Sequence, residues 1–332
     1  MKIAVVGATG LVGREMLTVL AERGIGQQDV IVAASPKSVG KTLPFAGRQL
    51  TVVSVDDAIA QRPQYAIFSA GAAPSRHYAP LFATIGTTVI DNSSAWRKEP
   101  DVPLVVPEIN IDAVRPHHRI IANPNCSTIQ MVLALSPLQR EYGIRRLVIA
   151  TYQSITGTGI KAVRQLEAEE VNTEHCTLST ERAYPYQIHR NLFPHGGDFL
   201  PDGYTTEEQK LVDETRKIFA DPSIQITATV VRVPVVGGHS EAVNVELRRD
   251  YDLDHVRHLI AATPGVILYD DPANNLYPMP ILAHHRDEVW VGRLRRDPSQ
   301  PRSLNLWVVA DNIRKGAATN AVQIMQALIE RR

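Results

Sequence analysis

The sequence predicts an α/β protein: an N-terminal Rossmann-like, doubly wound dinucleotide-binding domain and a second, α+β domain with a mainly antiparallel or mixed sheet. The apolar, β-branched run at residues 2–6 enters a glycine-rich turn and then a helical apolar pattern, as dinucleotide-binding folds do. Strand-like and helix-like segments then alternate through residues 29–91, which indicates a parallel sheet. The 332 residues suffice for two domains, placed at residues 1–125 with 312–332 and at residues 126–311.

The overall composition excludes several classes of protein. Lys plus Arg and Asp plus Glu number 35 each, so no basic field attracts nucleic acid or an anionic membrane. No apolar run approaches the ~18 residues of a membrane span, and no secretion signal precedes the first strand. Two cysteines in so long a chain fit a reducing compartment. We therefore expect a cytoplasmic protein that binds neither nucleic acid nor a membrane.

Glycines stand at every third position of the first turn, at Gly7, Gly10 and Gly13. The first allows the tight turn, the second lets backbone approach a pyrophosphate, and the third lets the helix pack on the strand. The helix N-terminus then faces the phosphates. A glycine-rich structural turn is the alternative. The cofactor-binding residues expected here are Gly7, Thr9, Gly10, Leu11, Val12 and Gly13.

The second strand, residues 29–34, ends without the acid that usually binds the ribose hydroxyls of NAD. Ser35, Lys37 and Ser38 follow it and offer hydroxyls and a cation. These groups suit a 2′-phosphate, so we expect NADP rather than NAD. The alternative is a solvated basic turn.

Two later strands of the first domain end in small polar residues: Ser69 and Gly71 lie at one end, and Ser93 follows the other. Ligands of parallel sheets bind beyond the carboxyl ends of the strands, so we expect these residues near the cofactor. Arg97, just past the second of these ends, is a candidate anion ligand, with an ordinary surface charge as the alternative.

Cys126 has an unusual local frame. A buried-looking strand at residues 119–122 runs into Asn-Pro-Asn-Cys-Ser-Thr, and an apolar helical pattern begins at once. Because Asn, Ser and Thr favour helix starts, Cys126 is expected at a helix N-terminus. The helix dipole favours a thiolate there, which makes this thiol a candidate nucleophile. The alternative is a small buried hydrophobic residue.

A strand at residues 145–152 leads into a second glycine turn that holds Gln153, Ser154 and Gly157. Gln153 is a candidate for orienting substrate or water near the thiol, or else a strand-end amide bonded to backbone. Ser154 and Gly157 are assigned to cofactor binding.

Residues 172–204 lack clear periodicity, so we expect a long irregular segment. The second cysteine, Cys176, lies there without a helix-start frame and is assigned no role. Cys176 and His175 offer too few ligands to bind a metal ion, so no metal site is predicted.

Residues 205–210 have the pattern of a helix start with a capping box. Glu207 and Lys210 share a face of this helix, and most such pairs are solvated surface pairs. Farther on, His239 follows two glycines and stands seven residues after Arg232. Glycines let backbone approach a ligand, and histidine exchanges protons near pH 7, so His239 is a candidate general acid or base.

The chain ends in a predicted helix with an alanine-rich apolar face, opening within residues 311–320. Such a helix packs closely on surfaces that contain glycine. We therefore expect it to return to the first domain, with Asn312 near the nicotinamide.

With these segments in place, the chain closely resembles the aspartate-β-semialdehyde dehydrogenase family nearly from end to end. Asn-Pro-Asn-Cys-Ser-Thr and the spacing of Arg232 and His239 are its most specific signals. The matching segments keep the family's order and spacing: residues 7–13, 123–128, 153–159, 207–210, 232–240 and 311–320. The resemblance implies NADP-dependent reductive dephosphorylation of L-4-aspartyl phosphate to L-aspartate-4-semialdehyde through a thioester, in the biosynthesis of lysine (with diaminopimelate), threonine, methionine and isoleucine.

The resemblance also implies a role for each residue near the thiol. Cys126 is the nucleophile, His239 the general acid and base, and Gln153 an orienting residue. Arg232 binds the substrate carboxylate and Glu207 the substrate amine.

The same resemblance assigns phosphate to Arg97, Asn125 and Lys210. Where this chain has Lys37, the family often has arginine. Lysine keeps the charge but lacks the planar fork, so NADP binding is expected to be weaker or less exclusive. A homodimer is also implied, with residues 126–311 as the catalytic and dimerisation domain, since a sheet-rich domain needs something to cover its open face.

Two other functions stay open on the sequence. One is that of N-acetyl-glutamyl-phosphate reductase, a related enzyme whose acetylated substrate has no ammonium to pair with Glu207. The other is a catalytically silent NADP-binding paralogue. The intact set of Cys126, Arg232 and His239 argues against the silent paralogue.

Overall fold

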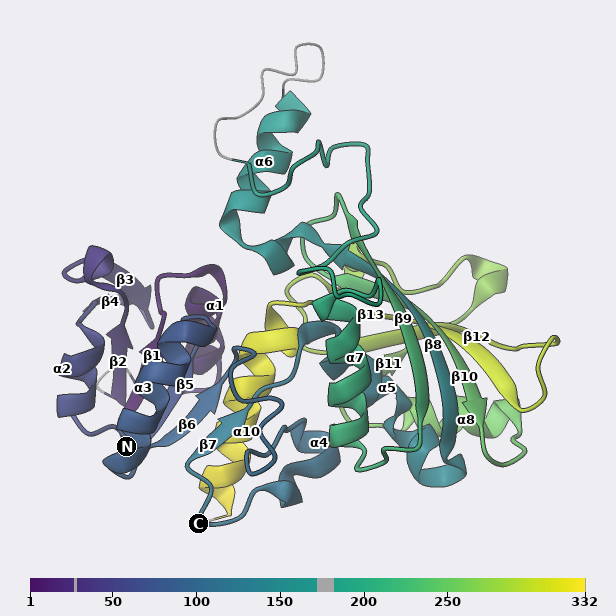
Figure 1. Ribbon diagram of the computed structural model, residues 1–332, viewed down its shortest axis with the longest axis horizontal. Coiled ribbons are helices and arrows are strands. Elements are labelled where there is room, and N and C mark those ends of the chain that lie inside the picture. The colour runs from purple at the N-terminus through teal and green to yellow at the C-terminus, as the bar shows by residue number, and fades with distance from the viewer. Residues whose placement is uncertain (27–28, 172–181, 332) are drawn as a thin grey trace. The chain divides into compact units, whose positions relative to one another are not determined.

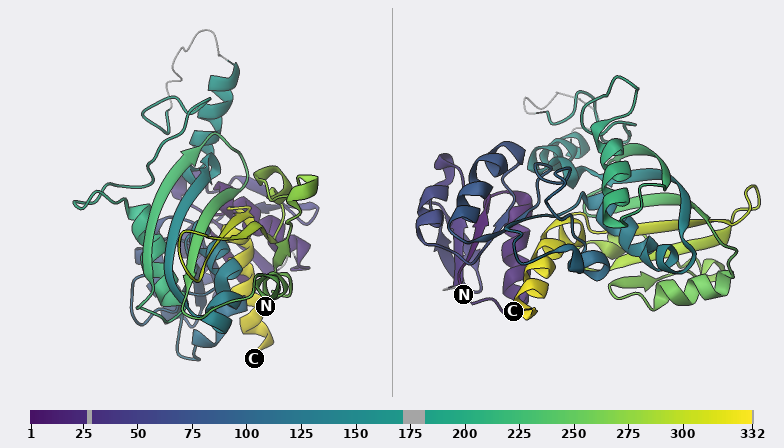
Figure 2. Two further views of the ribbon diagram at one scale, coloured as in Figure 1. Left: turned by 90° about the vertical axis from the view of Figure 1, so that its right-hand side faces the viewer. Right: turned by 60° about the horizontal axis from the view of Figure 1, so that its bottom comes forward.

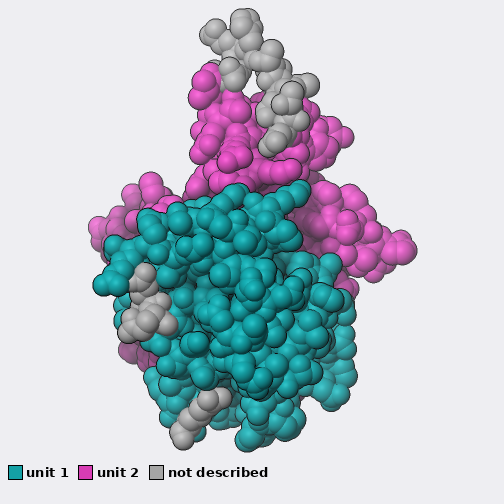
Figure 3. Space-filling view, turned by 90° about the vertical axis from the view of Figure 1, so that its left-hand side faces the viewer, with its two compact units in different colours: residues 1–125, 316–332 teal, residues 126–315 magenta. Residues whose placement is uncertain are grey.

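A computed structural model describes residues 1–26, 29–171 and 182–331 of the chain. The chain divides into two compact units: unit 1 comprises Met1–Asn125 with Gly316–Arg332, and unit 2 comprises Cys126–Lys315 (Figure 3). The predicted α/β class is confirmed, because unit 1 has a parallel sheet and unit 2 a mixed one. Within the described ranges, no helix is both long enough and apolar enough to cross a lipid bilayer.

Unit 1 is built on five parallel strands in the order β2-β1-β5-β6-β7 (Figure 1). The strands are β1 Ile3–Val6, β2 Val30–Ala33, β5 Tyr65–Phe68, β6 Thr88–Asp91 and β7 Ile120–Ala122. β1 pairs with β2 on one side and β5 on the other, so the strand order reverses at β1. Such a switch point opens a crevice beyond the carboxyl ends of the strands.

Both faces of this sheet are buried, because successive side chains point to opposite sides. Ile3 and Val5 pack in a core with the helices α1 (Leu11–Glu22) and α10 (Thr319–Glu330). Ala4 and Val6 pack in a second core with α2 (Val55–Ala60) and α3 (Ala72–Thr84). Unit 1 also contains a hairpin of β3 (Thr42–Phe45) and β4 (Arg48–Thr51) and the short helix α4 (Pro107–Asn110). The C-terminal helix is therefore part of the core of unit 1.

Unit 2 is built on a six-stranded mixed sheet in the order β11-β12-β13-β10-β8-β9 (Figure 1). The strands are β8 Ile144–Ser154, β9 Gln225–Val233, β10 His239–Leu247, β11 Val266–Leu268, β12 Val289–Arg296 and β13 Ser303–Ala310. His239 is the first residue of β10 rather than part of the turn before it. It belongs to the strand because it pairs with Ala310 of β13.

One face of this sheet carries the helices α5 (Cys126–Tyr142), α7 (Thr206–Ile218) and α8 (Leu253–Ala261) (Figures 1 and 2). α5 packs on four strands and on both other helices, and nearly all its side chains are buried. The helices α6 (Ile160–Val171) and α9 (Pro280–Ala283) complete the unit.

Two predictions from the sequence, for residues 172–204 and for residues 312–315, are compared with the structure as follows. Residues 182–204 contain no helix or extended strand, as expected, whereas Cys176 and His175 lie outside the described residues. Residues 312–315, which the sequence assigned to the first domain, cluster with unit 2. The reason lies in Asn312, whose side chain is bonded within unit 2.

Candidate active site

One edge of the unit 2 sheet collects most of the residues singled out by the sequence. β8 and β9 run parallel, so they end together, and Gln153 lies opposite Arg232. β10 runs antiparallel to β8, so its first residue, His239, starts at this same edge. The register therefore brings Gln153, Arg232 and His239 together although they are far apart in sequence.

The backbone of Ser154 is hydrogen-bonded to two of these side chains, His239 and Arg232. Its N–H donates to Nδ1 of His239 at 2.9 Å, and its carbonyl accepts from Nη1 of Arg232 at 2.6 Å. His239 is 0% exposed and Arg232 is 7% exposed. The end of β8 thus fixes the positions of a buried imidazole and a buried guanidinium.

Gly157, in the turn after β8, lies beside both Arg232 and His239. A Cβ atom at Gly157 would lie 2.9 Å from Nη1 of Arg232 and 3.4 Å from Nε2 of His239. A larger residue would press on the guanidinium, which its bond to Ser154 holds in place. The side chains of Arg232 and His239 therefore both pack against Gly157.

The protonation of His239 follows from this setting. Burial and, to a smaller extent, the Arg232 cation lower its pKa to about 3, although the Glu207 carboxylate acts to raise it. The ring is therefore neutral near pH 7. Because Nδ1 accepts from Ser154, the neutral ring carries its proton on Nε2. Nε2 is buried and has no hydrogen-bond partner among the described residues, so it presents an N–H for a ligand.

Cys126 is the first residue of α5 and is half-buried, so the predicted helix-start position is correct. The start of α5 is bonded to the same sheet edge. Nε2 of Gln153 donates to Oγ of Ser127 at 2.9 Å, and Nε2 of Gln130 donates to the carbonyl of His239 at 3.2 Å. Gln130, which the sequence analysis missed, lies one helical turn after Cys126 and ties α5 to His239. Gln153 is bonded to a side chain rather than to backbone.

Glu207 and Lys210 form an ion pair of 2.8 Å at the start of α7. Their side chains are only 13% and 26% exposed, so they are not the solvated surface pair that the pattern alone favours. The predicted capping box is present between Thr205 and Glu208. Glu208 also accepts from the backbone N–H of Val230 in β9, which fixes the helix start against the strand that carries Arg232.

A cavity of about 430 Å³ opens beside Arg232. Its walls come mainly from the irregular segment, including Tyr184, Phe193 and Gly196. Phe193 exchanges two backbone hydrogen bonds with Arg232, and the hydroxyl of Tyr184 donates to Thr158. Burial raises the pKa of Tyr184 although the Arg232 cation opposes the rise. Sequence reasoning carried no residue over from this segment, because nothing local shows that it folds over Arg232.

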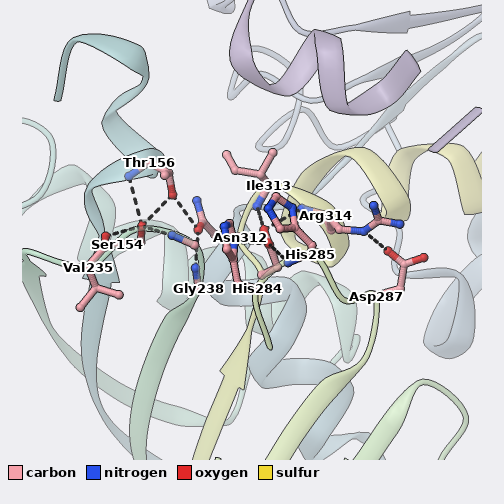
Figure 4. A network of polar contacts seen from close by, with 12 residues as sticks. Ser154, Thr156, Val235, Gly238, His284, His285, Asp287, Asn312, Ile313 and Arg314 are labelled. Atoms are coloured by element: carbon pink, nitrogen blue, oxygen red, sulfur yellow. Dashed lines mark hydrogen bonds and ion pairs between the residues drawn. The ribbon is translucent and has the colours of Figure 1, made fainter. Parts of the chain in front are cut away.

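Asn312 belongs to a polar network that reaches Ser154 (Figure 4). Its Oδ1 accepts from Oγ1 of Thr156 at 2.9 Å and from the backbone N–H of Gly238 at 3.2 Å. Thr156 in turn contacts Oγ of Ser154 at 2.7 Å. The network fixes the turn that precedes His239.

In unit 1 two glycines of the first turn, Gly7 and Gly13, have no room for a side chain. Gly7 has φ +87°, and a Cβ there would lie 2.4 Å from the carbonyl oxygen of Ser69. A Cβ at Gly13 would lie 2.2 Å from the carbonyl oxygen of Gly7. Gly10 caps α1 without a side-chain hydrogen bond, so the helix start stays open to a ligand. This cradle fits the pyrophosphate of a dinucleotide.

A cavity of about 450 Å³ lies at this turn and at the ends of β1, β2 and β5. Of the expected residues it is lined by Gly7, Thr9, Gly10, Ser35 and Ser69. Lys37 is exposed and does not line it. Asp56, at the start of α2, does line it, and only the folded hairpin and helix bring this acid there. The wall thus carries an acid that the sequence analysis missed.

The remaining predicted residues of unit 1 are placed differently. Arg97 is 8% exposed and donates to the carbonyl of Asn92, so the reading of an ordinary surface charge is wrong. Ser93 donates to Asp91, and Gly71 is the N-cap residue of α3. Asn125 is buried and directly precedes Cys126.

The strand end that leads to Asn125 is anchored by asparagines. Asn123 donates to the side chain of Asn92 at 2.6 Å and accepts from Asn320 of α10 at 2.7 Å. All three belong to unit 1.

Comparisons with known proteins agree with this layout. Residues 2–117 match the NAD binding domain of semialdehyde dehydrogenases, and residues 135–315 match their dimerisation domain. The chain therefore binds a nicotinamide dinucleotide, and the second match supports the expected homodimer. The aspartate-semialdehyde dehydrogenases of Aquifex aeolicus and Legionella pneumophila are both 48% identical to this chain over 99% of it, covering 98% and 95% of their own lengths.

Solved structures give the same result. Aspartate semialdehyde dehydrogenase II from Vibrio cholerae, also solved complexed with ASA, is 43% identical with a TM-score of 0.95, over 99% of this chain and 98% of that one. The enzyme from Candida albicans, solved with NADP, shares the fold at 23% identity and a TM-score of 0.77, over 98% of both chains. On this sequence identity over nearly its whole length, the chain belongs to the aspartate-semialdehyde dehydrogenase family.

Proposed function

We propose that this enzyme converts L-4-aspartyl phosphate to L-aspartate-4-semialdehyde, with NADPH as reductant and a thioester on Cys126 as intermediate. The observation that carries the proposal is that His239 and Arg232 are both hydrogen-bonded to the backbone of Ser154. The start of α5, where Cys126 lies, is hydrogen-bonded to the same edge of the sheet. A thiol at a helix start, a neutral imidazole donor and a buried cation are the groups that acyl transfer to a small anionic substrate requires.

The substrate is an amino acid with a phosphorylated side chain, and each of its charges has a proposed partner. Arg232 binds the carboxylate and Glu207 the ammonium. Both charges act on the pKa of His239, so both lie within electrostatic range of the ring. The resemblance to the family assigns Arg97, Asn125 and Lys210 to phosphate.

In the proposed chemistry, Sγ of Cys126 attacks the acyl carbon, and the C–O bond to phosphate breaks. Covalent catalysis splits one difficult step into two easier ones. The nicotinamide cofactor, when bound, supplies the hydride that reduces the thioester. The C–S bond of the resulting tetrahedral oxyanion then breaks, which releases the aldehyde and returns the thiolate.

His239 acts in this scheme as a donor. Its Nε2–H has no partner among the described residues and is proposed to bind the substrate oxygen, while its Nδ1 is already bonded to Ser154. It therefore stabilises the oxyanion that forms in each step, and it does not begin as a base. Gln153 holds the start of α5 through Ser127 and thereby orients Cys126.

The preference for NADP is proposed on the composition after β2, where Ser35, Lys37 and Ser38 stand in place of an acid. Asp56 on the cavity wall works against a 2′-phosphate, so we expect the preference to be incomplete. The proposed cofactor contacts in unit 2 are Ser154, Gly157 and Asn312. The cysteine content favours the cytoplasm as the site of action.

The reaction is tested in reverse by following NADPH formation from L-aspartate-4-semialdehyde and NADP, with and without inorganic phosphate. Sustained, phosphate-dependent NADPH formation is expected. Binding of NADP without any turnover would contradict the proposed reaction and favour a silent paralogue.

A further inference from the structure

A second cluster of chemically reactive side chains lies in unit 2 and is not used by the proposed function. It consists of His284 and His285, which follow α9 and are labelled in Figure 4, and of Asp311, which follows β13. One ligand atom from each of the three residues lies within 4.8 Å of the others. Within the described part of the chain, this is the one group of three such side chains that could hold a metal ion.

Asp311 is fixed in place by four hydrogen bonds. It is 2% exposed. Its Oδ2 accepts from Nδ1 of His284 at 3.1 Å and from the backbone N–H of His285 at 2.8 Å. Its Oδ1 accepts from the backbone N–H groups of Ile313 and Arg314. The carboxylate therefore cannot turn away from the histidines.

The two imidazoles are held beside this carboxylate. Their ring centroids lie 3.7 Å apart with a tilt of 31°. His285 has φ +61°, a left-handed conformation that is uncommon for residues other than glycine and that lets its backbone N–H reach Asp311. His284 fills the space above Gly237, where a Cβ would lie 1.8 Å from Nδ1. The two rings therefore lie in contact with one another beside Gly237.

The separations match those of ligands around one ion. The 3.1 Å between Nδ1 of His284 and Oδ2 of Asp311 is close to the roughly 3.3 Å expected between neighbouring ligands of a tetrahedral Zn²⁺ with bonds of ~2.0 Å. An ion could therefore replace the proton that these two atoms share. His285 is exposed, so its ring can turn to supply a third ligand, and water can fill the open position.

We propose that His284, His285 and Asp311 form a binding site for a divalent transition-metal ion such as Zn²⁺, with a ring nitrogen of each histidine and the carboxylate of Asp311 as ligands. Imidazole nitrogens favour Zn²⁺, Ni²⁺, Co²⁺ and Cu²⁺ over Mg²⁺ and Ca²⁺, which prefer oxygen. The site adjoins Asn312 and the turn before His239.

The test is Zn²⁺ binding by isothermal titration calorimetry with the full chain, purified without a histidine tag. All variants carry Cys126→Ser, which removes the thiol as a competing ligand. One Zn²⁺ per chain is expected. His285→Asn should weaken binding by about tenfold or more, and asparagine tolerates the left-handed backbone there. His284→Asn together with His285→Asn should abolish binding.

A matched control exists in unit 1, where His117 and His118 are also adjacent with ring centroids 4.2 Å apart but belong to no such cluster. His117→Asn with His118→Asn should leave Zn²⁺ binding unchanged, and unfolding midpoints should show that all variants are folded. The proposal is overturned if the Cys126→Ser protein binds no Zn²⁺, if the His284 and His285 variants bind it normally, or if the control pair abolishes binding equally.

Discussion

The backbone N–H of Ser154 donates to Nδ1 of His239, and this single bond decides what the imidazole can do. Because the lone pair of Nδ1 accepts this hydrogen bond, the proton of the neutral ring is on Nε2. With its pKa lowered to about 3 by burial and by Arg232, His239 remains neutral through the range in which enzymes are assayed. It therefore enters the reaction as a hydrogen-bond donor.

Replacing His239 tests this role through the pH dependence of the reaction. His239→Asn should lower kcat by about 100-fold or more, because an oxyanion donor is lost. The acid limb of kcat/KM should keep its midpoint, since His239 does not titrate there. Rates of both proteins between pH 5 and 9 give the answer. A limb near pH 6.5 that vanishes in the variant would show that His239 acts as a base.

Cys126→Ser should reduce turnover by at least about 1,000-fold, because an alcohol at the same place is a far weaker nucleophile. NADP binding should persist, since the glycine cradle lies in unit 1. Turnover and fluorescence titration of NADPH measure the two properties separately. Substantial activity in this variant would contradict covalent catalysis by Cys126.

Glu207→Gln tests the assignment of the substrate ammonium. KM for L-aspartate-4-semialdehyde should rise by about tenfold or more, because a charge-assisted contact becomes neutral. Lys210 also loses its partner, and because Lys210 is itself assigned to phosphate, KM for phosphate is measured in the same variant. Unchanged KM, or better activity with the N-acetylated five-carbon substrate, would favour the N-acetyl-glutamyl-phosphate reductase reading.

Two substitutions test cofactor choice in opposite directions. Lys37→Ala should lower the ratio of kcat/KM for NADP over NAD by up to about tenfold, which corresponds to ~1.4 kcal/mol. Asp56→Asn should raise that ratio, because it removes a negative charge from the cavity wall. Steady-state kinetics with both cofactors measure the ratio. A wild-type preference for NAD would show that the prediction from Lys37 was wrong.

Glu241 of β10 makes stability depend on pH. It is fully buried, neither carboxyl oxygen has a partner among the described residues, and burial raises its pKa well above 4.5. A folded-state pKa above the unfolded one favours the protonated form. The contribution of Glu241 to stability is therefore fully present below pH 4.5 and is lost as the pH rises toward the folded-state pKa, by up to ~1.4 kcal/mol per pH unit.

Glu241→Gln cannot ionise and should lack this loss. The variant should gain stability relative to wild type between pH 5 and pH 8, as measured by urea unfolding at each pH. If the free energy of unfolding depends on pH in the same way in wild type and in Glu241→Gln, the pKa of Glu241 is not raised.

Local patterns were enough to predict much of this molecule. The strand, glycine turn and helix at Gly7–Gly13, the helix start at Cys126 and the capping box at Thr205 each depend on a few neighbouring residues. Long-range register was not predictable in the same way. Nothing near Gln130 indicates that it reaches His239, and nothing near Asp56 indicates that it lines the cofactor cavity.

Besides long-range register, the burial of charged side chains was not predictable from the sequence. Arg97 and the pair of Glu207 and Lys210 look like surface charges locally, yet packing removes most of each side chain from water. The cover that Tyr184 and Phe193 form beside Arg232 comes from an irregular segment, which has no periodicity to read.

The central claim is that the acyl group passes through Cys126, and rapid mixing without phosphate tests it most directly. Enzyme, NADP and L-aspartate-4-semialdehyde should give a burst of about one NADPH per active site and then stop, because phosphate is needed to release the acyl group. Intact mass and peptide mapping should find the acyl adduct on Cys126, and phosphate should discharge it. Steady NADPH formation without phosphate, or a burst that leaves Cys126 unmodified, would contradict the account.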